Sequence, residues 1–314
     1  LHVITQKGKG YRPAELNPDV FHGIGCFDPA DGSTPLTAHL PTFSDTFGSV
    51  MCAIAAQEPR LCAISAAMVR GTGLSEFEKS FPERCFDVGI AEEHAVAMAG
   101  GLAKQGMIPV VAIYSTFLQR AYDMLLQDVA MLDLHVVFAV DRAGLVGEDG
   151  ETHHGLFDVN YLRSVPNMQI LSPANQAELE QMLRHAILEM KGPVAVRYPR
   201  GCDGAYTQCA SVPLLRAGQD ITLVGYGTLV NELLLAADLL KKKGVSAEVL
   251  KLPSIKPLDI AAIRTSVRKT GNLLIAEEAV CTGCAGKEIV AALRAGGLNI
   301  PIRLCNAGDR FVPH

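Results

Sequence analysis

Charged and aromatic side chains directly follow four apolar runs of this sequence, which end near Gly89, Ile113, Val140 and Tyr198. The segments after these runs are Ala91–His94, Tyr114–Arg120, Asp141–His153 and Pro199–Gly201. We expect these segments to bring one or two carboxylates, a tyrosine, a phenylalanine, three arginines and a histidine to one edge of a sheet. Guanidinium groups bind phosphate and carboxylate oxygens through paired hydrogen bonds, and carboxylates and imidazoles transfer protons. The sequence therefore predicts a site for an anionic substrate.

The apolar runs are predicted to be strands of one mostly parallel sheet. Their Val, Ile and Ala residues do not alternate with polar ones, which is typical of strands buried on both faces. Strands are predicted near 61–65, 85–89, 108–114, 135–140, 170–172 and 194–198, and helices near 43–56, 92–104, 117–132 and 176–190. In such sheets ligands bind beyond the carboxyl ends of the strands, so the four segments should meet there.

Each candidate residue also has an ordinary structural interpretation. Glu92 at a helix start could serve only the helix dipole, and Phe117 could simply pack. Arg142 and Arg200 could be exposed loop residues. Their convergence favours a functional site, because unrelated structural residues have no reason to gather at one end of one sheet.

A second α/β unit follows a polar, turn-rich linker. Its strands are predicted near 221–225, 245–252, 273–276 and 302–305, and its helices near 229–243, 258–269 and 287–295. The predicted fold class is thus α/β, with two consecutive three-layer domains built on mostly parallel sheets. We expect a connector at 1–41, the first domain at 42–200, a linker at 201–219 and the second domain at 220–314. Both ends are expected to be truncated.

Composition excludes several classes of protein. The 314 residues are 49% hydrophobic and 19% charged, and 28 basic and 33 acidic residues give a net charge of -5. We expect no nucleic-acid partner, because no basic block stands out beyond Lys241–Lys243. We expect no membrane span, because no apolar run reaches roughly 18 residues. Nine cysteines, an odd number, indicate reduced thiols and hence a cytoplasmic protein, or a plastid stromal one in a plant or alga.

Two further motifs are weak. Gly225-Tyr226-Gly227 lacks the third glycine of a dinucleotide-binding fingerprint, so we do not expect NAD. Cys281 and Cys284 form a CxxC motif without a second pair of ligands, so we do not expect zinc, and a redox role stays open.

Three segments carry a family resemblance: Ile90–Ala95, Tyr114–Asp123 and Asp141–His153. Over its whole length the sequence resembles the second half of the transketolase-like thiamine diphosphate enzymes. The second and third segments match the branch of that family that makes 1-deoxy-D-xylulose 5-phosphate and separate it from transketolase itself. Tyr198–Gly201 agrees with this branch.

The resemblance implies condensation of pyruvate with D-glyceraldehyde 3-phosphate, with loss of CO2, on thiamine diphosphate and Mg2+. This transferase reaction opens the non-mevalonate isoprenoid pathway and also feeds thiamine and pyridoxal synthesis. The implied domains are a pyrimidine-binding domain and a transketolase C-terminal domain in a homodimer. The diphosphate-binding domain with its Mg2+ ligands would lie outside this sequence, apart from a tail at 1–27. We therefore expect no metal site in this sequence and no activity from it alone.

The resemblance also implies roles for individual residues. Glu92 would hydrogen-bond the pyrimidine N1′ of the cofactor, Phe117 would stack on that ring, and Ile90 would keep the cofactor bent. The implied substrate-binding residues, which would hold the phosphate of the aldehyde, are Tyr114, Arg142, Arg200 and, with a less defined role, Arg120. The implied catalytic groups near the reacting carbonyls are His153, Asp149 and His22.

One residue departs from the family pattern, and two other functions stay open. Glu93 stands where many relatives have glutamine; its charge should raise the proton affinity of Glu92 and be tolerated. One alternative is the β subunit of a 2-oxoacid dehydrogenase, which would copurify with an α chain or a lipoyl acyltransferase. The other is a non-catalytic module for anion binding or assembly.

Overall fold

The computed structural model describes residues 1–18, 20–34, 40–147, 150–209 and 213–313. The chain divides into two units, Leu1–Leu40 and Pro41–His314. The first unit contains helix α1 (Arg12–Leu16) and the 3-10 helix η1 (Val20–His22). Its aromatic rings cluster, with centroids 5.4, 5.6 and 5.9 Å apart, and belong to Tyr11, Phe21 and Phe27. The segment predicted as a connector therefore has a small aromatic contact of its own.

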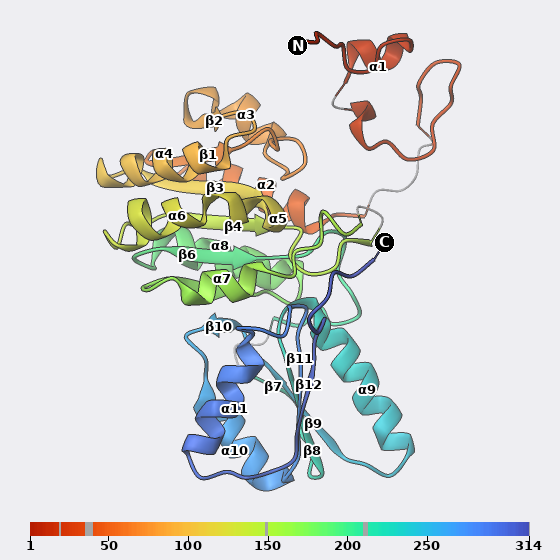
Figure 1. The fold of residues 1–314 in the computed structure, drawn as a ribbon, viewed down its shortest axis with the longest axis vertical. Helices are drawn as coiled ribbons and strands as arrows, with labels where there is room; N and C mark the ends of the chain where they lie inside the picture. Colours follow the sequence, from red (N-terminus) through yellow and green to blue (C-terminus); the bar gives the residue numbers. More distant parts are fainter. Residues whose placement is uncertain (19, 35–39, 148–149, 210–212, 314) are drawn as a thin grey trace. The chain divides into compact units, whose positions relative to one another are not determined.

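The second unit contains a seven-stranded sheet (Figure 1). Its strands are β1 (Leu61–Ser65), β2 (Cys85–Asp87), β3 (Ile108–Tyr114), β4 (Val137–Asp141), β5 (Gln169–Leu171), β6 (Val194–Arg197) and β10 (Ser254–Lys256). Their order is β10-β5-β6-β4-β3-β1-β2, and only the β10–β5 pair is antiparallel. Every residue of β1, β4 and β6 is buried, as the apolar runs predict.

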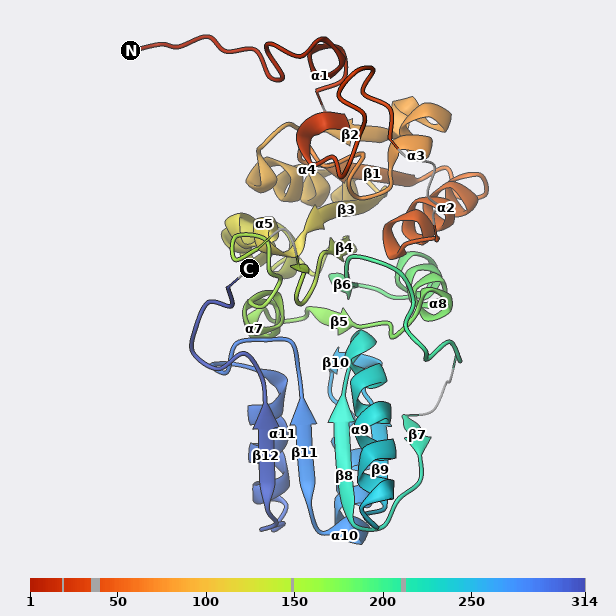
Figure 2. The same ribbon diagram turned by 90° about the vertical axis from the view of Figure 1, so that its right-hand side faces the viewer.

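Helices cover both faces of this sheet, so the carboxyl ends of its strands are left for a site. Helices α2 (Phe43–Ala55) and α8 (Gln176–Leu188) share one buried cluster with the strands, and α4 (Glu92–Lys104) and α7 (Asp158–Ser164) share the other. Figure 2 shows the two pairs on opposite sides of the sheet. Helix α3 (Ser75–Ser80) and the 3-10 turn η2 (Pro82–Arg84) lie between β1 and β2 in the chain.

The helix predicted at 117–132 is broken into four pieces. They are α5 (Ser115–Leu118), η3 (Gln119–Ala121), α6 (Tyr122–Met124) and the π-helical η4 (Leu125–Ala130). Single-turn π segments are rare and often accompany functional sites. Periodicity alone cannot distinguish these pieces from one regular helix, because all of them present apolar residues to the same sheet.

Two adjacent glycines of α4 test how closely this helix packs on η4. A Cβ at Gly100 would lie 2.6 Å from the backbone oxygen of Asp128, whereas one at Gly101 would meet nothing within 4 Å. We expect Gly100→Ala to lower the free energy of unfolding by about 1–3 kcal/mol through overpacking. Its matched control, Gly101→Ala, should raise that free energy by up to about 1 kcal/mol, because alanine favours the helix. Denaturant unfolding checks both values, and equal effects would contradict the close contact.

A second, five-stranded sheet follows in the chain. Its strands are β7 (Leu214–Arg216), β8 (Ile221–Gly225), β9 (Ala247–Lys251), β11 (Leu273–Ala276) and β12 (Ile302–Cys305). Their order is β12-β11-β8-β9-β7, and only the β7–β9 pair is antiparallel. The 3-10 turn η6 (Gly227–Leu229) leads into α9 (Val230–Lys242), which packs on one face. Helices α10 (Ile260–Thr270) and α11 (Ala285–Ala295) pack on the other (Figure 1).

The predicted fold class is confirmed, and two short strands correct the predicted elements. Strand β7 lies inside the segment predicted as a linker, and β10 belongs to the first sheet although it follows β9 in the chain. Each has three residues, which is too short to show a periodicity. No helix in the described part of the chain is long and apolar enough to cross a membrane.

Buried polar contacts connect the two sheets. Arg197 at the end of β6 donates from Nε to Asp158 Oδ2 of α7 over 2.8 Å. The Arg197 guanidinium carbon also lies 5.4 Å from the ring centre of Tyr226, which follows β8. The Tyr226 hydroxyl donates to Glu277, which follows β11, over 3.2 Å. Nearby, the buried Lys251 of β9 pairs with Glu178 of α8.

Candidate active site

The first residue of α4 places a carboxylate at the carboxyl end of the seven-stranded sheet. The Glu92 side chain is 2% exposed, and its Oε1 accepts a hydrogen bond from Arg120 Nη1 over 2.8 Å. The second oxygen, Oε2, has no hydrogen-bond partner among the described residues. The next residue, Glu93, is exposed. This agrees with helix geometry, which places Glu93 about 100° further around the helix than Glu92.

Aromatic rings and guanidinium groups form a row that leads to Glu92. The rings of Tyr114 and Phe117 are stacked, with centroids 5.9 Å apart and planes 19° from parallel. The Arg142 guanidinium carbon lies 4.1 Å from the Tyr114 ring centre, and that of Arg120 lies 5.1 Å from the Phe117 ring centre. The structure thus joins four predicted site residues to Glu92 in one contiguous row.

Arg142 is held in place by several oxygen atoms. It follows β4 in the left-handed backbone region, with φ +57°. Its Nη1 donates to the backbone oxygen of Gly71 over 2.6 Å, to Asp141 Oδ2 over 2.8 Å and to the Ser44 hydroxyl over 3.1 Å. The charge of Arg142 is therefore partly neutralised before any substrate binds.

Asp141 and Ser44 are site residues to which sequence reasoning assigned no role. Burial raises the pKa of the Asp141 carboxyl above its ordinary value, and Arg142 and Ser44 offset only part of this rise. The Ser44 hydroxyl donates to Asp141 Oδ2 over 2.8 Å. Ser44 lies in the first turn of α2, far from Asp141 in the chain, so no local pattern could have indicated this contact.

Two glycines allow the close approaches that build the row. A Cβ at Gly71 would lie 1.8 Å from the Tyr114 hydroxyl, and a Cβ at Gly155 would lie 2.4 Å from the Arg142 backbone oxygen. Gly155 also exchanges two backbone hydrogen bonds with Gly144, of 2.7 and 2.8 Å. These bonds close the loop that carries His153.

Two consecutive histidines of this loop have different environments. His153 is half-buried and meets Phe117 edge to face, with ring centroids 5.5 Å apart. His154 is buried, and its Nδ1 accepts a hydrogen bond from the Val146 amide over 3.1 Å. The proton of a neutral His154 ring therefore lies on Nε2. Only His153 contacts the aromatic row through a described ring contact.

The remaining predicted residues differ in what the structure shows of them. Ile90 is 81% exposed and precedes Glu92 by two residues. Arg200 is exposed and lines a hollow of about 330 Å³ together with Leu145 and Glu278. His22 belongs to the first unit, where its side chain is exposed on η1. Asp149 lies outside the described residues.

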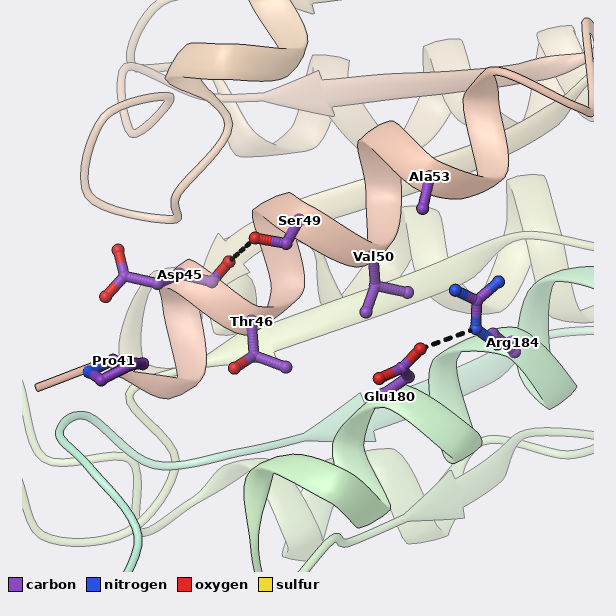
Figure 3. A pocket seen from close by; sticks show the side chains of 8 residues that line it. All are labelled: Pro41, Asp45, Thr46, Ser49, Val50, Ala53, Glu180 and Arg184. Atoms are coloured by element: carbon purple, nitrogen blue, oxygen red, sulfur yellow. Dashed lines mark hydrogen bonds and ion pairs between the residues drawn. The ribbon is translucent and has the colours of Figure 1, made fainter.

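A larger groove, of about 370 Å³, runs between α2 and α8 (Figure 3). Its walls carry Asp45, Thr46 and Ser49 on α2 and the ion pair of Glu180 with Arg184 on α8, whose Nε and Oε1 are 3.0 Å apart. No predicted site residue lines this groove. The predicted site residues therefore do not lie in the larger of these two hollows.

Fold and site together define a class of protein. Residues 40–202 match the transketolase pyrimidine-binding domain, and residues 210–314 match the transketolase C-terminal domain. The chain belongs to the transketolase family, as its motifs predict.

Individual relatives narrow this class. The chain is 48% identical over 326 residues to 1-deoxy-D-xylulose-5-phosphate synthase of Desulforudis audaxviator, covering 100% of this chain and 51% of the relative. It is 46% identical over 322 residues to the synthase of Heliobacterium modesticaldum, covering 100% of this chain and 50% of that relative. The chain thus spans about half the length of the curated relatives it matches.

A solved structure shares the fold. It is described as a split-gene transketolase, an inactive β4 tetramer. The match has a TM-score of 0.77 and 28% sequence identity, and it covers 86% of this chain and 90% of the other. The two-domain α/β architecture predicted from the sequence is therefore that of a known transketolase chain.

Proposed function

We propose that this chain works with the remaining half of a full-length enzyme as a 1-deoxy-D-xylulose-5-phosphate synthase. The reaction joins pyruvate and D-glyceraldehyde 3-phosphate with loss of CO2. The observation that carries the proposal is the buried Glu92 carboxylate at the end of the row of rings and guanidinium groups. The names and identities of the curated relatives support it.

The residues present fit the pyrimidine end of thiamine diphosphate. When bound, this cofactor supplies the nucleophilic carbon and accepts the electron pair released by decarboxylation. Glu92 Oε2 offers an unused hydrogen-bond acceptor on a side chain that is 2% exposed, suited to the pyrimidine N1′. Phe117 offers an aromatic surface, and the exposed Ile90 an aliphatic one. We propose that the Mg2+ ligands lie in the half of the enzyme outside this chain.

We propose that the Glu92 carboxylate would hold a proton on the pyrimidine N1′ of the bound cofactor. A buried carboxylate next to one arginine interacts more strongly with a ring nitrogen than an exposed one, because little water competes with it. Arg120, whose side chain is 47% exposed, orients Glu92 through Oε1. We propose this pair as the proton-holding element of the site.

The substrate phosphate would lie at the arginine-rich side of the row. We propose that Arg200, Arg142 and Tyr114 bind it, with Arg120 nearby. Arg142 is already paired with Asp141, so it would orient the phosphate through hydrogen bonds more than it would attract it by net charge. We propose that His153, next to Phe117, faces the reacting carbonyl groups. Asp149 and His22 stay proposed catalytic groups on the strength of the family resemblance alone.

The role of Arg200 can be tested by substitution. In the full-length enzyme, Arg200→Ala should raise KM for D-glyceraldehyde 3-phosphate by about 10–100-fold, the value of one lost charge-assisted hydrogen bond. KM for pyruvate should change little, because pyruvate has no phosphate. Arg303→Ala, at an exposed position of β12, is the matched control. Steady-state kinetics measure both constants, and equal increases for the two substrates would remove Arg200 from the phosphate site.

The function itself is tested by supplying the other half. We expect the chain, expressed together with a diphosphate-binding half, to release CO2 from pyruvate only when thiamine diphosphate and the aldehyde are present. A requirement for a lipoyl acyltransferase would instead favour the β subunit of a 2-oxoacid dehydrogenase. No thiamine-dependent reaction under these conditions would favour the non-catalytic module.

Assembly and location follow as further proposals. We propose a homodimer, which the oligomeric description of the solved relative supports in general terms. We propose a cytoplasmic location, or plastid stroma in a plant or alga. All nine cysteines are unpaired in the structure, which supports a reducing compartment.

A further inference from the structure

Cys281 and Cys284 occupy the two ends of a tight turn that leads into α11. Thr282 and Gly283 form the centre of this turn, and Gly283 has a φ of +77°. A positive φ at the third position is the property of a type II turn and explains the glycine there. The ends of such turns have Cα atoms within about 7 Å of each other, next to the range of about 4.4–6.8 Å found in disulfides. The turn therefore brings the Cα atoms of the two cysteines to about the separation that a disulfide needs.

The two thiols differ in exposure. Cys281 is half-buried and can be reached from solvent, whereas Cys284 is 1% exposed. Burial, together with the hydrogen bond and charge of Glu277, raises the pKa of the Cys284 thiol to about 11. Reduced Cys284 therefore gains no stability from ionisation, and a stabilised thiolate is what makes a disulfide easy to reduce.

We propose that Cys281 and Cys284 form a thiol–disulfide modification site whose oxidant is a small soluble disulfide such as glutathione disulfide. Cys281, as thiolate, attacks one sulfur of the oxidant and releases the first glutathione thiolate. Cys284, after losing its proton, attacks the Cys281 sulfur and releases the second. One sulfur–sulfur bond forms and one breaks, the two thiol protons pass to the released thiolates, and the oxidant is reduced to two thiols.

The turn is attached to the first sheet through α7. Asn160 of α7 donates from Nδ2 to the backbone oxygens of Val280, over 3.0 Å, and of Thr282. Arg163 of α7 donates to the backbone oxygen of Gly283 over 3.2 Å. We expect closure of the disulfide to change these hydrogen bonds, because they hold the backbone of the turn itself. The same helix carries Asp158, the buried partner of Arg197, so the modification acts on a segment that connects the two sheets.

The test is oxidation of the purified chain in a glutathione redox buffer, followed by alkylation of the remaining thiols and peptide mass mapping. We expect the peptide that contains both cysteines to lose two hydrogen atoms in most molecules, without bound glutathione. The exposed Cys305, which then carries glutathione, shows that the oxidant is active. Cys281→Ser should abolish the loss of two hydrogen atoms. It should also leave Cys284 without bound glutathione, because the buried Cys284 thiol cannot reach the oxidant by itself.

Three results would overturn the inference. The first is a peptide that keeps both thiols while Cys305 is modified. The second is a stable glutathione adduct on Cys281 without an internal bond, because Cys284 would then be out of reach. The third is unchanged amide hydrogen exchange in α7 after oxidation, which would contradict its attachment to the turn. Amide hydrogen exchange in α9, which packs on the face of the second sheet opposite α11, is the internal control.

Discussion

Glu92→Gln in the full-length enzyme is expected to slow thiamine-dependent decarboxylation of pyruvate by about 10²–10⁴-fold, the range that a positioned acid–base group contributes. The glutamine keeps the size of the side chain but loses the charge that favours a proton on the pyrimidine ring. Exchange of the C2 proton of the bound cofactor should fall by a similar factor. Arg120 is 47% exposed, so water can solvate its charge and the fold should survive.

Glu93→Gln is the matched control for this prediction. It removes the same charge one residue further along α4, from an exposed side chain. Its decarboxylation rate should stay near that of the wild type, because the exposed Glu93 side chain lies about 100° further around the helix than Glu92. Undiminished C2 proton exchange in Glu92→Gln would refute the role of Glu92, and equal losses in both variants would show a general charge effect instead.

Asp158→Ala is expected to lower the free energy of unfolding by about 3–5 kcal/mol, because it leaves a buried arginine without its counterion. Arg197 and Asp158 have side chains that are 4% and 0% exposed, and their closest atoms are 2.8 Å apart. A shift in the midpoint of denaturant unfolding measures the change.

The double variant Asp158→Leu with Arg197→Met tests whether the two charges or the packing of the two side chains stabilises the contact. Replacing both charges with apolar groups of similar size is often neutral or stabilising, so this variant should unfold much closer to the wild type. A double variant as unstable as Asp158→Ala would show that the ion pair itself stabilises the contact between the sheets. Asp158→Ala within about 1 kcal/mol of the wild type would contradict the burial argument.

The site and the contact between the sheets share one helix. Helix α7 supplies Asp158 to the buried ion pair, and its Tyr161 hydroxyl approaches the backbone oxygen of Ser115, 3.5 Å away. Ser115 begins the segment that carries Phe117 and Arg120. Changes at the interface between the sheets can therefore reach the aromatic row through packed elements rather than through a flexible loop.

The apolar runs by themselves determined the fold class and predicted where the candidate site lies. A strand of Val, Ile and Ala without alternation must be covered on both faces, which requires crossover helices and a parallel sheet. In a parallel sheet all carboxyl ends lie at one edge. Tyr114 and Arg142 follow neighbouring strands of this kind, and the structure places the Arg142 guanidinium over the Tyr114 ring. The roles of these residues stay predictions, whereas their proximity is observed.

Only the tertiary structure decided which partners these side chains meet. Ser44 and Asp141 are 97 residues apart and pair because α2 packs beside the end of β4. Strand β10 joins the first sheet because the edge of β5 has free backbone groups, and no pattern within three residues can encode that pairing. Periodicity records which side of an element faces the core, a local property. The distance between two elements depends on the path of the whole chain, so contacts such as that of Arg120 with Glu92 appear only after folding.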